Sequence, residues 1–332
     1  MIHMAVIGCG KIGTRHLNAY RSIKGVNIAA VCDIDKELAN EVANNYNALS
    51  YNNYKKVLGN KTIDAVDVCV PTAIHHEVIL EALERGKAVF CEKPLSHKLE
   101  YAKQIEKKQK ETGNLVMVGY LYRFHPSFQR LKKVLEDNII GEPYFAISRI
   151  GGRGGWRAWK HQKDKGGGAM LEMLVHMLDL ANYCFGEIVE VERFFSETIL
   201  KRRMIEGREV EVDAEDCVLV RLRAKSGVHI FCEADLITPS YMNTVEVHGD
   251  NGSFFGSILD NIPTIIYCKE SRGMFDRGKN VFKNPYVNLM EKELQFFIES
   301  LSREIKPMNS VEESIKITEI VEQVRGQSRR KN

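Results

Sequence analysis

The chain has 332 residues, of which 44% are hydrophobic and 27% are charged, with 47 lysines and arginines against 44 acidic residues. At about 150 residues per domain, this length predicts two domains with ordinary hydrophobic cores. The composition excludes a disordered chain, and a formal net charge of +3 gives no electrostatic reason to expect nucleic acid or an anionic membrane as a partner.

The sequence has no run near the roughly 18 apolar residues of a membrane span, so we expect no membrane partner. Its first residues, Met1-Ile2-His3-Met4, lead straight into an apolar run and leave no room for a secretory leader, so we expect a cytoplasmic protein. The eight cysteines are dispersed, with no C-x-x-C pair and no Cys/His cluster at zinc spacing. We therefore expect reduced, buried thiols and no metal site. The adjacent pair His75-His76 does not change this expectation, because we expect His76 on a helix surface.

Residues 1 to about 120 alternate short apolar runs with amphipathic segments of helical length. This rhythm is typical of βαβ units and predicts a parallel sheet. The expected strands are Met4–Ile7, Asn27–Cys32, Ala65–Val70, Lys87–Cys91 and Leu115–Val118. The expected helices are Arg15–Ile23, Lys36–Asn45, His75–Glu84 and Leu99–Glu111.

From about Gly141 onward the apolar runs alternate with period two, which predicts a mainly antiparallel sheet. The expected strands are Pro143–Ile150, Ile188–Phe195, Val210–Arg223, Val228–Asp235, Tyr241–His248 and Ser253–Ile258. A helix over Ala169–Phe185 is expected to cover one face of this sheet. Two helices close the chain, about Asn288–Ser302 and Ser310–Arg325, and the second begins with a capping box from Ser310 to Glu313.

The first expected strand runs into Gly8-Cys9-Gly10-Lys11-Ile12-Gly13, a G-x-G-x-x-G at the turn from strand to helix. In a dinucleotide-binding turn, such glycines allow the tight turn, the approach of backbone to the pyrophosphate and close packing of helix on strand. Asp33 ends the second strand, where its carboxylate would accept hydrogen bonds from the adenosine ribose hydroxyls. The same carboxylate repels a 2′-phosphate, so the sequence favours NAD over NADP, with Lys36 and Arg15 left as candidate phosphate ligands.

The expected fold class is therefore α/β followed by α+β. Residues 1–120 would form a Rossmann dinucleotide-binding domain. Residues 121–332 would form a substrate-binding and oligomerisation domain, whose large, mainly antiparallel open-faced sheet is covered by helices on one side. The C-terminal helices, at about 288–325, are expected to pack back on the first domain.

Further motifs follow in a fixed order. They are Val70-Pro71-Thr72-Ala73-Ile74-His75, Gly86 to Leu95 with Glu92-Lys93-Pro94, Gly119-Tyr120, Arg123-Phe124 with Pro126, Ile140-Gly141-Glu142, and Gly166-Gly167-Gly168 leading to Glu172, His176 and Asp179. In these motifs and their order, the chain resembles the Gfo/Idh/MocA oxidoreductase family over almost its whole length. The resemblance and the glycine motif together assign as cofactor-binding residues Gly8, Gly10, Lys11, Ile12, Gly13, Asp33, Val70, Pro71, Thr72, His75, Glu92, Lys93, Pro94 and Arg123.

Glu172, His176 and Asp179 fall near one face of the expected helix. A carboxylate bonded to one imidazole nitrogen fixes the tautomer and raises the basicity of the other, which suits a general base for a sugar hydroxyl. The alternative, a surface i,i+4 pair, is disfavoured by the glycine run and the E-K-P triplet. Lys93 is expected at the carboxyl end of a strand, where its ammonium can hydrogen-bond the reacting oxygen, and the resemblance implies that role.

Two departures from the family pattern concern this site. Glu172 stands where the family usually has aspartate, and Leu121-Tyr122 replaces an asparagine-like position. The glycine-rich loop from Gly151 to Lys160 holds both tryptophans and resembles the loop in which relatives present a tryptophan-basic pair; a hinge or an oligomer contact is the alternative. The expected substrate-binding residues are Tyr122, Trp156, Arg157, Trp159, Lys160 and Asp179.

These residues predict NAD-dependent oxidation of a secondary hydroxyl of a sugar, sugar derivative, nucleotide sugar or cyclitol, or reduction of the matching ketone. His176, oriented by Glu172, would be the general base, and Lys93 would polarise the oxygen. Two alternatives stay open: a redox-neutral glycosidase or lyase that oxidises its substrate transiently, and a non-catalytic NAD(P)-binding sensor. A sheet with one uncovered face, together with the resemblance, predicts a homodimer or homotetramer through the C-terminal sheet.

Overall fold

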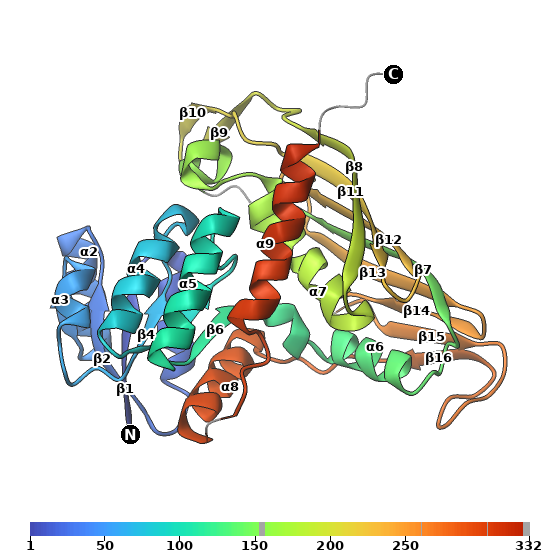
Figure 1. Ribbon diagram of the computed structural model, residues 1–332, viewed down its shortest axis with the longest axis horizontal. Helices are drawn as coiled ribbons and strands as arrows, with labels where there is room; N and C mark the ends of the chain where they lie inside the picture. The colour runs from blue at the N-terminus through green and yellow to red at the C-terminus, as the bar shows by residue number, and fades with distance from the viewer. Residues whose placement is uncertain (153–156, 260, 304, 328–332) are drawn as a thin grey trace. The chain divides into compact units, whose positions relative to one another are not determined.

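The computed structural model describes residues 1–152, 157–259, 261–303 and 305–327 (Figure 1). The chain divides into two compact units. The first consists of Met1–Leu121 and Asn288–Thr318, and the second of Tyr122–Val287 and Glu319–Asn332. Within the described ranges, no helix has the length and apolar character needed to cross a membrane.

The first unit is built on a six-stranded parallel sheet in the order β3-β2-β1-β4-β5-β6. Its strands are β1 (Ile2–Ile7), β2 (Val26–Cys32), β3 (Leu49–Tyr51), β4 (Ala65–Val68), β5 (Ala88–Glu92) and β6 (Val116–Gly119). The central strands are almost wholly buried, as in a parallel sheet with helices on both faces. The order reverses between β1 and β4, and ligands of such sheets bind at this switch point, beyond the carboxyl ends of the strands.

Helices connect and cover these strands. They are α1 (Lys11–Tyr20), α2 (Lys36–Tyr46), α3 (Tyr54–Leu58), α4 (Thr72–Glu84), α5 (Leu99–Thr112) and α8 (Leu289–Arg303), with the first half of α9 (Val311–Gly326). Helix α4 packs against α5, side by side in Figure 1, and α1 packs against α8. The α/β fold class expected for this part of the chain is confirmed.

The second unit contains an eight-stranded sheet in the order β16-β15-β14-β13-β7-β12-β11-β8. Its strands are β7 (Pro143–Gly151), β8 (Ile188–Glu197), β11 (Cys217–Ala224), β12 (His229–Asp235), β13 (Met242–Gly249), β14 (Gly252–Gly256), β15 (Thr264–Cys268) and β16 (Gly278–Phe282). Only the pair β12–β7 is parallel within this sheet. The prediction of a mainly antiparallel sheet is confirmed.

One face of this sheet is covered by helices. A π-helical turn (Met170–Leu174) and α7 (Val175–Phe185) pack on β7, β11 and β12, and α6 (Pro126–Glu136) packs on β14. Alternate residues of β11, such as Val218, Val220 and Leu222, are buried, while the residues between them are half-buried. The other face carries the rings of Phe145, Phe231 and Phe194. The ring centroid of Phe231 lies 5.6 Å from that of Phe145 and 5.9 Å from that of Phe194.

Some expectations were wrong in detail. The single strand expected over 210–223 is two strands, β10 (Arg208–Glu211) and β11, and β10 pairs with β9 (Arg202–Ile205) in a separate hairpin. Just before β11, the Asp216 carboxylate accepts hydrogen bonds from the backbone N–H groups of Ile199 and Leu200, at 2.7 and 2.8 Å, which link this segment to the loop between β8 and β9. The capping box at α9 is confirmed: the backbone N–H of Glu313 donates to Ser310 Oγ at 3.3 Å, and that of Ser310 donates to the Glu313 carboxylate at 3.2 Å.

Candidate active site

The glycine turn after β1 has little room for side chains. Gly8 has a φ of +104°, and a Cβ there would lie 2.5 Å from the carbonyl oxygen of Cys69. A Cβ on Gly13 would collide with the carbonyl of Gly8. Helix α1 begins at Lys11, with Gly10 as its N-cap and no side chain capping that end. A helix N-terminus at a tight glycine turn is the arrangement in which dinucleotide-binding folds place a pyrophosphate.

Asp33 follows β2 and is tied to this turn. Its carboxylate accepts hydrogen bonds from the backbone N–H of Cys9 at 2.8 Å and of Asp35 at 3.0 Å. The residue is half-buried, so part of the carboxylate stays accessible beside the glycine turn. This placement suits the contact with ribose hydroxyls that the sequence predicts.

Two further turns follow the neighbouring strands β4 and β5 at the same edge of the sheet. They carry Val70-Pro71-Thr72 and Glu92-Lys93-Pro94. His75 joins them, because its ring nitrogens lie 2.9 Å from the carbonyl oxygens of Val70 and Pro94. The Glu92 carboxylate accepts a hydrogen bond from the backbone N–H of Lys93 at 3.1 Å. The first unit thus brings the predicted cofactor residues of three separate segments to one edge.

His176 lies at the start of α7 in the second unit. Its side chain is largely buried, and its ring stacks on that of Tyr122, with centroids 4.6 Å apart. The Tyr122 hydroxyl makes a short hydrogen bond with that of Tyr241. Burial, and then the neighbouring Tyr241, raise the pKa of Tyr122 well above its usual value, so this phenol keeps its proton. Tyr241 was not among the expected site residues.

Glu172 lies in the π-helical turn that precedes α7, and its carboxylate accepts a hydrogen bond from the ammonium of Lys160. Lys160 also lies 5.4 Å from the centre of the Trp159 ring. Arg157, in contrast, pairs with Glu206 in the turn between β9 and β10. Of the two expected tryptophan-basic pairs, Trp159-Lys160 therefore lies against the helix of the candidate site, while Trp156 falls outside the described residues.

Arg123 and Asp179 form a buried ion pair in the second unit. Their side chains are each 1% exposed. The guanidinium donates from Nε at 3.0 Å and from a terminal nitrogen at 2.6 Å to the two carboxylate oxygens. The sequence suggested a cofactor contact for Arg123 and a substrate contact for Asp179, and both contacts stay predictions. The structure shows that the two side chains form a buried ion pair with each other.

Glu215 supports the start of the helical segment that carries Glu172 and His176, and sequence reasoning did not identify it. Its carboxylate accepts a hydrogen bond from the backbone N–H of Met170 at 3.1 Å, and its carbonyl accepts one from Ala169 at 2.7 Å. Burial raises the pKa of this carboxyl group. Glu215 lies far from the helix in the sequence and carries no motif, so only the fold brings the two together.

The cysteines are all free thiols. Burial raises the pKa of Cys9, Cys32, Cys184 and Cys232 to about 12, so these thiols stay protonated near neutral pH. The expectation of inert, buried thiols fits these environments.

Comparison with known proteins agrees with this arrangement. Residues 2–120 match the family described as "Oxidoreductase family, NAD-binding Rossmann fold", and residues 128–255 match the "GFO/IDH/MocA C-terminal domain". The chain is 29% identical to myo-inositol 2-dehydrogenase of Thermotoga maritima over 94% of this chain and 92% of that one. It is 31% identical to scyllo-inositol 2-dehydrogenase (NAD(+)) of Bacillus subtilis over 81% of this chain and 78% of that one.

Among solved structures, levoglucosan dehydrogenase in complex with NADH and L-sorbose superposes with a TM-score of 0.88. The match covers 98% of this chain and 96% of that chain, at 22% sequence identity. At that identity the likeness is one of fold.

Proposed function

Because the chain belongs to the Gfo/Idh/MocA family of oxidoreductases and carries an NAD-binding Rossmann domain, we propose that it oxidises a secondary hydroxyl of a cyclitol or sugar. The relatives named myo-inositol 2-dehydrogenase and scyllo-inositol 2-dehydrogenase make cyclitols the first substrate class to test. In this proposal the first unit holds the cofactor and the second holds the substrate.

The observation that carries the proposal is the polar group of the second unit. There His176 stacks on Tyr122, while Glu172, one helical turn earlier, is paired with Lys160. These groups lie on buried segments of the chain. The imidazole supplies a proton acceptor, and the phenol and the ion pair supply hydrogen bonds for a polyhydroxylated ligand. A surface charge pair would not be buried in this way.

In the proposed reaction, His176 takes the proton of the substrate hydroxyl as the C–H bond of the same carbon breaks. NAD, when bound, would supply the acceptor for the hydride that leaves that carbon. Lys93 donates a hydrogen bond to the reacting oxygen and stabilises the negative charge that develops on it. Glu172 and Lys160 keep the local charge balanced next to His176, and Asp33 with the glycine turn would hold the dinucleotide.

The first experiment is a screen for NADH formation with cyclitols, free sugars and nucleotide-activated sugars, with NADP as the cofactor control. We expect turnover with NAD and a cyclitol or sugar. Product formation without net NADH would instead identify a redox-neutral lyase or glycosidase. Tight NAD binding without any product across the screen would favour a sensor.

The variant that tests the mechanism is Lys93→Met. We expect NADH binding to stay near the parental value, while turnover falls at least about a hundredfold, because one donor to the developing oxyanion is lost. Lys107→Met is the matched control, since Lys107 is 81% exposed on α5 and should leave both quantities unchanged. Parental turnover in Lys93→Met would remove Lys93 from the mechanism.

A further inference from the structure

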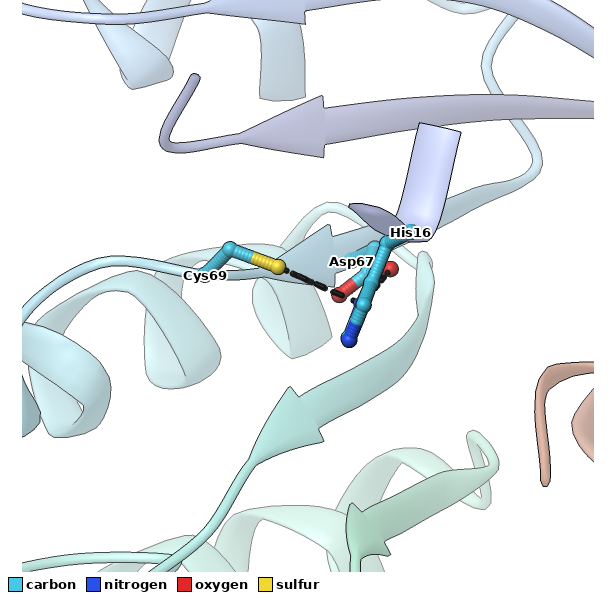
Figure 2. A group of neighbouring side chains, drawn as sticks. All are labelled: His16, Asp67 and Cys69. Atoms are coloured by element: carbon cyan, nitrogen blue, oxygen red, sulfur yellow. Dashed lines mark hydrogen bonds and ion pairs between the residues drawn. The ribbon is translucent and has the colours of Figure 1, made fainter. Parts of the chain in front are cut away.

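A buried polar cluster in the first unit includes His16, Asp67 and Cys69, which are drawn in Figure 2. It consists of His16 from α1, Asp67 from β4, Cys69 just after β4, and Glu92 at the end of β5. The side chains of His16 and Asp67 are 0% exposed, and that of Glu92 is 13% exposed. Charged groups buried so completely are costly unless they are paired.

The His16 imidazole lies between the two carboxylates of the cluster, with a hydrogen bond to Asp67 and an ion-pair contact with Glu92. Its Nδ1 lies 2.8 Å from Oδ2 of Asp67, and its Nε2 lies 3.2 Å from Oε1 of Glu92. A carboxylate offers only acceptor oxygens, so an imidazolium, with a hydrogen on both nitrogens, suits this position. Burial alone would lower the pKa of His16, but the Asp67 carboxylate and Cys69 outweigh burial and raise it well above its usual value.

Cys69 completes the Asp67 side of the cluster. Its thiol donates to the other carboxylate oxygen of Asp67 at 3.2 Å, and its sulfur lies 3.4 Å from His16 Nδ1. Burial raises the pKa of this thiol, so it remains a donor. Asp67 is thus engaged at both oxygens and has little freedom to turn away from His16.

On the other side of His16, the contacts continue to Lys93. While Oε1 of Glu92 faces the imidazole, Oε2 accepts the hydrogen bond of the Lys93 backbone N–H. An imidazolium would cancel one of the two carboxylate charges of the cluster. A single carboxylate therefore connects a rigid, buried imidazole with the backbone of the lysine proposed to polarise the reacting oxygen.

We propose that His16 is a positioning residue, which acts as a buried imidazolium between Asp67 and Glu92 to fix the Glu92 carboxylate and, through it, the backbone of Lys93. The proposal rests on the proposed function for the role of Lys93. A carboxylate held at both oxygens keeps its neighbour within the narrow range of positions that catalysis requires.

His16, Asp67 and Cys69 also offer the ligand types of a zinc site. Two observations favour the imidazolium. The separation between Nδ1 and Asp67 is that of a hydrogen bond, and Glu92 lies at the opposite nitrogen, from which it cannot share a metal with Nδ1. Structural zinc sites have four ligands, whereas this group has three. Stoichiometric zinc in the purified protein would overturn the proposal.

The first test measures the protonation of His16 by NMR on histidine labelled with nitrogen-15, with the signal assigned by its loss in His16→Gln. We expect an imidazolium signal that persists at pH 8, well above the ordinary histidine pKa of about 6.5. The ionisable groups that face this cluster from the surrounding elements are Tyr20, Asp67, Cys69, Cys91, Glu92 and Glu293. In Glu92→Gln the imidazolium should lose its proton at a lower pH. A neutral His16 at pH 7 in the parent protein would refute the proposal, whatever the substrate proves to be.

The second test is a double-mutant cycle of His16→Gln, Glu92→Gln and the double variant, on the substrate found by the screen. We expect each single variant to lower kcat by about a hundredfold, since the lysine is displaced rather than removed, and His16→Gln to do so with NADH affinity nearly unchanged. Because His16 acts through Glu92, the double variant should be no worse than the poorer single one. Additive losses would mean that the two residues act separately.

His76→Gln serves as the control, because His76 lies on α4, bonded to Gln104 and stacked on Tyr101. It should match the parent protein in kcat and NADH affinity. If the screen finds no substrate, the NMR experiment still decides the state of His16, so failure of the proposed function and failure of this inference remain distinct.

Discussion

The ion pairs near the candidate site are more buried than those on the surface helices. Arg123 and Asp179 are each 1% exposed, whereas Lys133 and Asp137 on α6 are 71% and 42% exposed. A surface pair gains little because water screens it, and the loss of one partner is tolerated. A buried pair behaves differently, because removal of one partner leaves an uncompensated charge in a medium that solvates it poorly.

This contrast yields a prediction for Asp179→Asn. The change keeps the shape of the side chain but leaves the Arg123 guanidinium without its countercharge, so we expect a loss of about 3–5 kcal/mol in the stability of the second unit. The measurement is the urea unfolding transition followed by tryptophan fluorescence, since Trp159 lies in this unit. Asp137→Asn is the control and should leave the midpoint nearly unchanged. Equal midpoints for the two variants would contradict a structural role for the buried pair.

Residues near each other in the sequence were the easier ones to assign. The expected helix already placed Glu172 and His176 on one face, and the loop from Gly151 already marked Lys160 as a candidate. Tyr241, the residue before β13, meets Tyr122 across 119 positions of the chain, so only the fold of the second unit creates this contact. No local spacing or composition marks such a partner, and the same holds for Glu215.

At the scale of elements, the helix that carries Glu172 and His176 begins in an unusual way. The sequence predicted one helix over Ala169–Phe185, but its first turn is π-helical and changes to an α-helix at Val175. Such turns occur often at functional sites. The turn is entered through Gly168, which has a φ of +109°, and a Cβ at this position would collide with the Glu215 carboxylate.

We therefore predict that Gly168→Ala destabilises the second unit by about 3 kcal/mol, because it combines an unfavourable backbone conformation with displacement of Glu215. Gly227→Ala is a matched control in the same unit: its φ is +96°, and a Cβ there meets nothing within 4 Å. Gly227→Ala should lower the stability of the second unit only through its unfavourable backbone conformation, by about 1–2 kcal/mol. Urea unfolding compares the two variants. Equal losses of stability in the two variants would show that the Glu215 side chain moves aside at no cost and does not stabilise the start of this helix.

The periodicity of hydrophobic residues located most long elements but not the short ones. The strands β1, β2, β4, β5 and β6 lie close to the expected segments because each is a buried apolar run. The short strand β3, with two exposed residues out of three, and the five-residue helix α3 lack enough positions to show a period. The sequence-based prediction merged strand β10 with β11 because Val210 and Val212 continue the alternation of apolar residues into the segment that separates the two strands.

At the scale of the whole molecule, the uncovered face of the second unit's sheet calls for an explanation. Phe194 is 49% exposed there, and Phe231 packs between it and Phe145 rather than against a helix. Charged residues such as Arg221 and Glu192 stand beside these rings and pair with each other, 2.9 Å apart. A surface of rings bordered by paired charges is typical of protein interfaces.

We predict that the protein is a dimer or tetramer at micromolar concentration and that Phe231→Asp shifts it toward the monomer. An aspartate at this position would bring an unpaired charge into the centre of an apolar contact, where burial of a charge is costly. Light scattering coupled to size-exclusion chromatography measures the mass directly. Leu49→Asp is the control, because Leu49 is 55% exposed on the edge strand β3 of the first unit and should leave the mass unchanged. A parental protein with the mass of one 37.8 kDa chain would rule out assembly through this sheet.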